Sequence, residues 1–364
     1  MPKPPVSIKE PRRLGLWIPF ALIVTSICAW SAYWFYTAHR IEGLIRQHQA
    51  ELISSGYRIV FDPFKVRGFP YRMFVDFKNL TVLAPSGRGF STSLLNAEAN
   101  AYALDKWVMN TPSDLTIYRG HTSGLKGVFD LGKLTVTGRS LKASVSGLTP
   151  GNSIPSIAVQ GLDVTLTPSD TRHPFAFSRA ENVEFYVRSP FAKGGSTAVI
   201  KGANPPDSAD VLLRVSGAHG VPGSVVGDLD PTQPFNLHIE GEITEASSLV
   251  GHGVTNWTAH GGQFQSLRSQ LTAGDLTLFA SSDVLSLDQG GHLTGRLSLD
   301  VTGTPQPLAV LGAMRIISPD NMTLAMPLLK MNLAPQPTQK FKMEFKDGHT
   351  YIGALKVSDA PILP

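Results

Sequence analysis

Residues that could carry out chemistry are scattered along this chain, and few have the spacing of a catalytic site. Acyl transfer by a serine needs the nucleophile in a Gly-x-Ser-x-Gly turn, and the sequence contains none. The stretch His260-Gly261-Gly262 resembles part of an oxyanion loop, but without that serine turn we interpret it as a glycine turn. A set of cysteine ligands, a His-Glu-x-x-His motif and a phosphate-binding glycine loop are also absent. The sequence therefore predicts no catalytic residue, no cofactor and no enzymatic activity.

Two further groups of polar residues bear on metal binding and on glycoside hydrolysis. His252 and His260 lie close in sequence but have no third ligand nearby, so we predict no metal site. Glu240 and Glu242 lie two residues apart, which places both on one face of a strand. Nothing favours a role as paired acid and base, and we interpret these carboxylates as groups that aid solubility and protect a strand edge.

The motif Gly68-Phe69-Pro70-Tyr71 has two interpretations. Glycine and proline act chiefly on backbone geometry, so the first interpretation is a fixed bend between two strands, with Phe69 plugging the core. In the second, Phe69 and Tyr71 form a docking surface near the membrane. We favour the bend and keep docking as the alternative.

An uncharged run covers residues 14–38, with the sequence LGLWIPFALIVTSICAWSAYWFYTA. At ~1.5 Å per residue, a helix of this length exceeds a hydrocarbon core of ~30 Å. Basic residues precede it at Lys3, Lys9, Arg12 and Arg13. Because such residues favour the cytoplasmic side, we predict that residues 1–13 are cytoplasmic and that the bulk of the chain is exported. Aromatic residues near the end of the run place its outer edge near Tyr36.

Two other fates of this run are less consistent with its residues. A cleaved signal peptide has an apolar region of only ~7–15 residues followed by small residues, whereas this run is longer and ends in aromatic residues. Lipid attachment at Cys28 would need a small residue where Ile27 stands. We therefore interpret Cys28 as a small apolar residue of a transmembrane helix.

Beyond the run, the apolar residues of 39–56 recur at helical spacing up to Gly56. This pattern predicts an amphipathic stalk helix that continues from the membrane and packs its apolar stripe on the domain that follows. From Tyr57 to the end of the chain, short segments rich in β-branched and aromatic residues alternate apolar and polar positions between glycine and proline turns. The predicted fold of residues 57–364 is therefore mostly β, a large antiparallel, curved or groove-forming sheet or sheets.

Three local features add detail to this β domain. One or two short helices are expected near 307–330, in Pro307–Ile317 and Pro319–Lys330. The pair Asp347-Gly348 predicts a tight hairpin turn. Glycine, aspartate and proline concentrate at 222–234, which marks a soft domain boundary.

Composition limits how this domain is stabilised and what it binds. Hydrophobic residues make up 42% of the chain and charged residues 16%, so the exported part is expected to fold. The sole cysteine of the chain lies in the apolar run, so the exported part must be stabilised by its core rather than by disulfides. The net charge of +4 comes partly from the residues before the run, and no basic cluster follows Arg46. We therefore expect no nucleic-acid partner.

The phrase Val66-Arg67-Gly68-Phe69-Pro70-Tyr71-Arg72, following an aromatic span and a stalk, resembles the domain of unknown function 2125 family of proteobacterial envelope proteins. The closing segment 345–364, FKDGHTYIGALKVSDAPILP, is similar to the ending of that family. This resemblance implies a single-pass protein of the inner (plasma) membrane whose bulk is periplasmic. A looser resemblance to AsmA-type inner-membrane-anchored proteins implies a groove-forming sheet linked to lipid movement. At ~4.8 Å per strand, however, a sheet of this size is too short to bridge an envelope alone.

We expect a membrane-anchored, non-enzymatic β protein that contacts the bilayer through residues 14–38 and binds or moves lipid or supports envelope homeostasis. Sheet faces that are apolar on one side need a second sheet or a hydrophobic guest. The alternative is a scaffolding subunit of an envelope protein complex. An unrecognised hydrolase is a third hypothesis, and it requires an enclosed pocket with perturbed titratable groups.

Overall fold

A single long helix leads into the β domain. The computed structural model describes residues 14–112, 114–124, 127–148, 154–170, 175–188, 207–229, 233–303, 310–312, 317 and 338–362. Helix α1 (Leu14–Ser54) runs for 41 residues, so the predicted membrane segment and the predicted stalk form one continuous helix. It ends before Gly56, whose φ of 88° is the left-handed conformation that glycine adopts readily. The helix therefore continues past the apolar run without a break, up to Ser54.

The domain after α1 consists mainly of a 17-stranded sheet, accompanied by the separate two-stranded sheet β6–β7. All strand pairs are antiparallel, as expected from the alternating sequence pattern. The strands are β1 (Arg58–Val60), β2 (Arg72–Leu83), β3 (Arg88–Asn100), β4 (Ala103–Thr111), β5 (Leu115–Arg119), β6 (His121–Gly124), β7 (Gly127–Asp130), β8 (Lys133–Thr137), β9 (Ser140–Ser146), β10 (Ser156–Pro168), β11 (Phe177–Arg188), β12 (Ser208–Gly220), β13 (Phe235–Thr244), β14 (Gln263–Ala273), β15 (Leu276–Leu287), β16 (Leu293–Thr302), β17 (Thr338–Lys346), β18 (His349–Ile352) and β19 (Leu355–Asp359).

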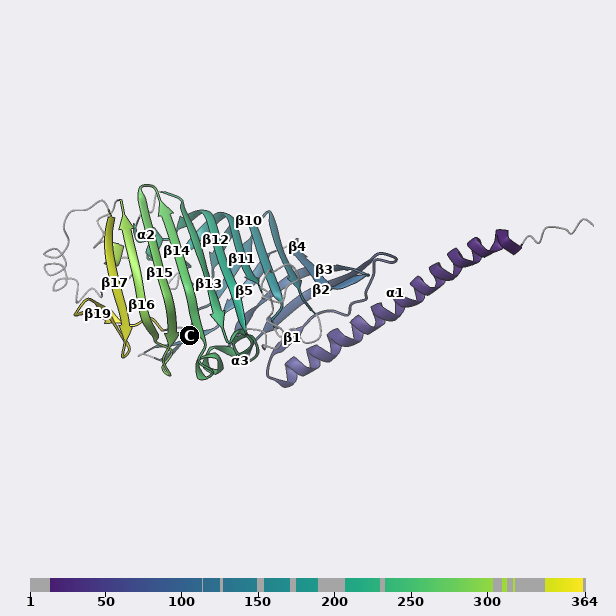
Figure 1. Ribbon diagram of the computed structural model, residues 1–364, viewed down its shortest axis with the longest axis horizontal. Helices are drawn as coiled ribbons and strands as arrows, with labels where there is room; N and C mark the ends of the chain where they lie inside the picture. The colour runs from purple at the N-terminus through teal and green to yellow at the C-terminus, as the bar shows by residue number, and fades with distance from the viewer. Residues whose placement is uncertain are drawn as a thin grey trace, which may run out of the picture.

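Strands that follow one another in sequence pair with one another, so the sheet is a long meander. From β10 onward each strand pairs with the next as far as β19. At the other end, β4 and β5 both pair with β3, while β8 and β9 both pair with β10. The sheet therefore curves, with β10–β17 in one layer and β2–β5 behind it (Figure 1).

The meander carries the sheet away from α1. In Figure 1 the ends of β2 and β3 lie beside α1, and β17 and β19 lie at the opposite end of the molecule. The connection at 222–234, expected as a soft boundary, joins β12 to β13, and these two strands pair directly. The Asp347-Gly348 turn between β17 and β18 has φ values of 53° and 72°, in agreement with the predicted tight hairpin.

Two short helices, α2 (Val225–Leu229) and α3 (Ala246–Ala259), were not expected from the sequence. Helix α3 contains Gly251 and Gly253, which lower helix propensity, and Gly253 interrupts it with a φ of 80°. It is held by Trp257, which is 1% exposed and donates its indole N–H to the Thr244 carbonyl at 2.6 Å. Of the short helices expected near 307–330, residues 310–312 are described and are helical, and Ile317 is described as a buried bend; the rest lies outside the described residues.

Some strand boundaries also differ from the sequence pattern. The residue pattern runs through 94–104 without a break, yet the chain turns at Ala101-Tyr102 and returns as β4. No glycine or proline marks this turn, and such residues are what sequence reasoning relies on. Asp76, a residue type that is rare in strands, does not interrupt β2, because it stays in the ladder opposite Asn96.

Candidate functional site

One face of the sheet, here called the inner face, carries an unbroken row of cross-strand partners. Each residue of this inner row pairs with the next on the neighbouring strand. In order, the row is Val75, Ala97, Met109, Ala143, Val159, Phe185, Leu213, Ile239, Ser269, Ala280, Leu299 and Phe341. Eleven of these twelve side chains are apolar, so the inner row is a hydrophobic track that crosses the sheet from β2 to β17.

The two ends of the inner row lie in separate hydrophobic cores. Val75 is fully buried in a cluster that also contains Trp34 of α1 and Phe64. Leu299 and Phe341 are buried in the main core, which is completed by Val226 of α2. These two clusters hold the ends of the track between the layers.

The middle of the inner row is less covered than its ends. Val159 is 40% exposed, and its cross-strand neighbour Phe185 is half-buried. Leu213 packs against the edge of the main core while staying half-buried. A second row beside it is apolar as well, consisting of Trp107, Val145, Ile157, Val187 and Val211. The centre of the inner face therefore presents apolar surface that neither core fully buries.

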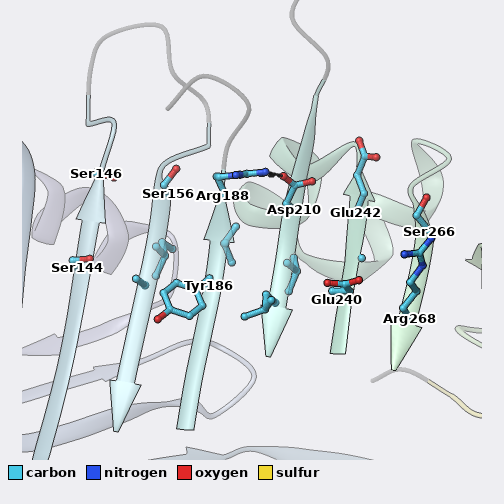
Figure 2. Close-up of a pocket in the computed structure, with 16 residues that line it drawn as sticks. Ser144, Ser146, Ser156, Tyr186, Arg188, Asp210, Glu240, Glu242, Ser266 and Arg268 are labelled. Carbon is cyan, nitrogen blue, oxygen red and sulfur yellow. Dashed lines mark hydrogen bonds and ion pairs between the residues drawn. The ribbon is translucent and has the colours of Figure 1, made fainter. Parts of the chain in front are cut away.

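The opposite, outer face of the same strands mixes charged, serine and apolar side chains and is slightly hollowed. A hollow of about 740 Å³ extends over β9–β14, and its lining includes Tyr186, Leu212 and Glu240 of this face together with inner-face residues such as Val187 and Val211. Figure 2 shows the labelled side chains on neighbouring strands, with the Arg188–Asp210 contact drawn across β11 and β12. Leu212 and Leu213 are consecutive residues of β12, so one lies on each face.

The charges of the hollow form surface pairs rather than a reaction centre. Arg188 donates from Nε and Nη2 to the same carboxylate oxygen of Asp210, at 3.1 and 2.7 Å. Glu240 lies 3.2 Å from Nε2 of His238, and it stands opposite Arg268 in the ladder. Asp210 stands opposite Glu242, so two carboxylates of like charge face each other across β12 and β13. Nucleophile, base and orienting group are not brought together here.

Glu240 and Glu242 share a face, as their spacing predicts, but their expected role at a strand edge is wrong. Strand β13 carries both, and it pairs with β12 on one side and with β14 on the other. The edge interpretation failed because a sequence cannot show which strands flank a given strand.

The other residues weighed for chemistry lie apart from this hollow. His260 follows α3 and its Nδ1 lies 2.8 Å from the Asn256 carbonyl, while Gly261 adopts a φ of 77° in a turn. Among the described residues no group of three or more histidine, cysteine or acidic side chains could hold a metal ion. The pKa of Asp288 is lowered chiefly by the backbone N–H of His292, within the turn that joins β15 to β16.

The Gly68–Tyr71 motif lies where the β domain meets α1. Gly68 adopts a φ of 106°, so the predicted bend is present. Phe69 does not plug the sheet core: it is 48% exposed and its ring packs on Phe35 and Trp34, with centroids 5.7 and 5.6 Å apart. Helix α1 supplies the aromatic surface on which the Phe69 ring packs, and the ring therefore turns away from the sheet.

Aromatic side chains of α1 donate hydrogen bonds to three backbone carbonyls of the domain at this junction. The indole N–H of Trp30 donates to the carbonyl of Pro70 at 2.9 Å, and that of Trp34 to the carbonyl of Arg72 at 3.0 Å. The Tyr33 hydroxyl donates to the Ala101 carbonyl at 3.3 Å. Sequence reasoning placed these residues in the membrane but missed the contacts, because aromatic residues near the end of a span are also typical of a lipid interface.

Comparison with known proteins places this architecture in a family. The model of a family described as "Uncharacterized protein conserved in bacteria (DUF2125)" matches residues 34–361. No curated protein and no solved structure matches the chain. The matched region begins at Trp34, so it contains the later part of α1, the Gly68–Tyr71 motif and nearly all of the β domain.

Proposed function

We propose, from the premise that this chain belongs to the DUF2125 family of uncharacterised bacterial proteins, that it is a single-pass membrane protein whose sheet binds lipid acyl chains. Lipid is a ligand in this proposal, and the protein carries out no reaction of its own. The acyl chain lies along the inner row, between the core that contains Trp34 and the main core.

The continuity of the inner row is the observation that carries this proposal. Six strands, β4 and β9–β13, contribute half-buried or exposed members of the row, from Met109 to Ile239. Five strand spacings of ~4.8 Å make a track of about 24 Å. One leaflet of a bilayer core is ~15 Å thick, so the track is long enough for an acyl chain.

The position of the track relative to the membrane supports the same ligand. Helix α1 is long and apolar enough to cross a membrane. Its residues Trp34 and Ala38 share one buried cluster with Val75, the first member of the inner row. A lipid leaving the bilayer beside α1 would therefore meet apolar side chains from the first strand onward.

The proposed orientation follows from the basic residues that precede α1. Lys9, Arg12 and Arg13 precede the apolar run, and such residues favour the cytoplasmic side. We infer that α1 spans the inner membrane with its amino terminus in the cytoplasm and that the β domain lies in the periplasm.

Leu213 and Leu212 offer a matched test, because both are leucines of β12 and only Leu213 lies on the inner face. The full-length protein would carry a photo-reactive amino acid at one position or the other, be activated in native membranes and be analysed by mass spectrometry. We expect phospholipid adducts at position 213 and none above background at position 212.

The same experiment has outcomes that contradict the proposal. Equal lipid labelling at the two positions would show contact with surrounding lipid rather than a binding track. An adduct with one reproducible protein at position 213 would favour the scaffolding alternative.

A further inference from the structure

We propose that a rim of the β domain, defined as residues 68–72 together with Ala101 and Tyr102, inserts into the interfacial layer of the membrane that α1 crosses. This inference rests on the proposed span of α1 and does not depend on lipid in the inner row. The rim belongs to the ends of β2 and β3, which Figure 1 shows beside α1.

The contacts of the rim with α1 set its depth in the membrane. Hydrogen bonds from Trp30 and Trp34 fix the rim at their level on α1. Counting from Leu14 at ~1.5 Å per residue, Trp30 lies about 24 Å and Trp34 about 30 Å along the helix. A hydrocarbon core is ~30 Å thick, so a helix that begins its span near Leu14 places the rim at the outer boundary of the core.

A second feature is the type of side chain that the rim exposes. Tyr71 and Tyr102 are each 69% exposed, and Phe69 is 48% exposed. On α1, Phe35 and Tyr36 are exposed at the same level. A tyrosine prefers the boundary between headgroups and hydrocarbon, where its hydroxyl meets water and its ring meets lipid. The rings of Phe35 and Phe69 suit the apolar side of the same boundary. Five aromatic side chains at one level form a collar of that kind.

A third feature is hydrogen bonding of the backbone. A carbonyl that leaves water must find another donor, since an unsatisfied carbonyl in hydrocarbon costs several kcal/mol. The carbonyls of Pro70, Arg72 and Ala101 accept from Trp30, Trp34 and Tyr33 of α1. These bonds satisfy three carbonyls of the rim that insertion would otherwise penalise.

Two arginine side chains lie beside the collar. Arg67 and Arg72 line a hollow of about 420 Å³ on the outer face, next to the rim. Their side chains are 64% and 62% exposed, and each also pairs with an acidic residue, Asp76 or Glu98. Long cationic side chains can keep their charged ends among lipid phosphates while their stems cover apolar surface. A phospholipid interface therefore complements both the rings and the guanidinium groups.

The test measures where the rim lies in a bilayer. Full-length protein with Cys28→Ser would carry a single new cysteine at Phe69, Tyr71 or Tyr102, labelled with an environment-sensitive dye. Phe279 and Val284 serve as matched controls, because both are exposed apolar residues of β15, far from α1 in the sheet. The protein would be reconstituted into phosphatidylcholine and phosphatidylglycerol vesicles that contain lipids spin-labelled near the headgroup.

We expect the spin-labelled lipid to quench the dye at all three rim positions and to leave the two control positions unquenched. Soluble iodide should show the opposite preference. Iodide quenching of the Tyr71 and Tyr102 labels as strong as that of the Phe279 label would overturn the proposal. A reproducible protein adduct from a photo-reactive residue at position 71 in cells would overturn it as well, because the rim would then bind a protein.

The experiments distinguish a rim that does not insert into the membrane from an inner row that does not bind lipid. Rim labels report insertion whether or not the inner row holds an acyl chain. Adducts at Leu213 report occupancy of the inner row, whatever the depth of the rim.

Discussion

The two faces of strands β9–β13 have the same backbone, but charged side chains gather on only one of them. On the inner face, Val159, Phe185 and Leu213 continue a row that begins and ends in buried cores. On the outer face, Ala158, Tyr186 and Leu212 line a hollow that also holds the Arg188–Asp210 ion pair. Since one strand supplies both, the comparison shows that a two-residue period is enough to separate an apolar track from a solvated surface.

Substitutions on the two faces should differ most in their effect on the free energy of unfolding where the inner row is fully buried. Leu299 is 1% exposed in the main core, whereas the adjacent Ser298 is exposed. Replacing Leu299 by Ala should lower the free energy of unfolding by about 2–5 kcal/mol, because it leaves a cavity. Ser298→Ala should change it by no more than about 0.5 kcal/mol. Denaturant titration of the detergent-solubilised protein checks both values, and similar losses would show that Leu299 is not in a closed core.

A second difference concerns the half-open middle of the row. Phe185→Ser should reduce the phospholipid that co-purifies with the full-length protein, since it places a hydroxyl in the apolar track. Tyr186→Ser, on the outer face, should leave this amount unchanged. Lipid per protein is measured by mass spectrometry after identical extraction, and circular dichroism confirms that both variants fold. Retention of lipid in Phe185→Ser would argue that lipid binds elsewhere, for instance around α1.

The outer face should tolerate loss of its charges. The Arg188 and Asp210 side chains are 68% and 57% exposed, so solvent screens their ion pair. Asp210→Asn should therefore cost at most about 1 kcal/mol of unfolding free energy. It also removes the repulsion between Asp210 and Glu242, which offsets part of that loss. A cost of several kcal/mol by denaturant titration would mean that the hollow is less solvated than its exposure indicates.

The smallest expected effect is a local dependence on pH at the turn between β15 and β16. Backbone N–H donation from His292 is the main cause that lowers the pKa of Asp288 below its usual value of 3.8. A carboxyl with a lowered folded pKa stabilises the turn above its unfolded pKa, and this contribution disappears as the pH falls through the folded pKa. The protection of the Gly290 and His292 amides against hydrogen exchange, relative to their intrinsic rates at each pH, should fall below about pH 4. In Asp288→Asn this acid-dependent change should be absent.

Much of the fold follows from local sequence patterns. The mostly antiparallel β architecture, the long apolar helix and the Asp347-Gly348 hairpin agree with expectation. Sequence analysis did not find α3, whose glycines disfavour a helix until Trp257 is buried, or the turn at Ala101-Tyr102. The Gly68–Tyr71 motif was recognised as a bend, yet the surface on which Phe69 packs was misplaced because its partners lie more than thirty residues away on α1.

The sequence by itself determined that residues 14–38 suit a lipid bilayer and that the later strands are apolar on one face. Both properties depend only on the order of side chains within a segment. The tertiary structure alone decided that Val159, Phe185 and Leu213 lie side by side and that Trp30 and Trp34 bind the carbonyls of the rim. Strand register and helix docking join residues that are distant in sequence, so they depend on the packing of the whole domain.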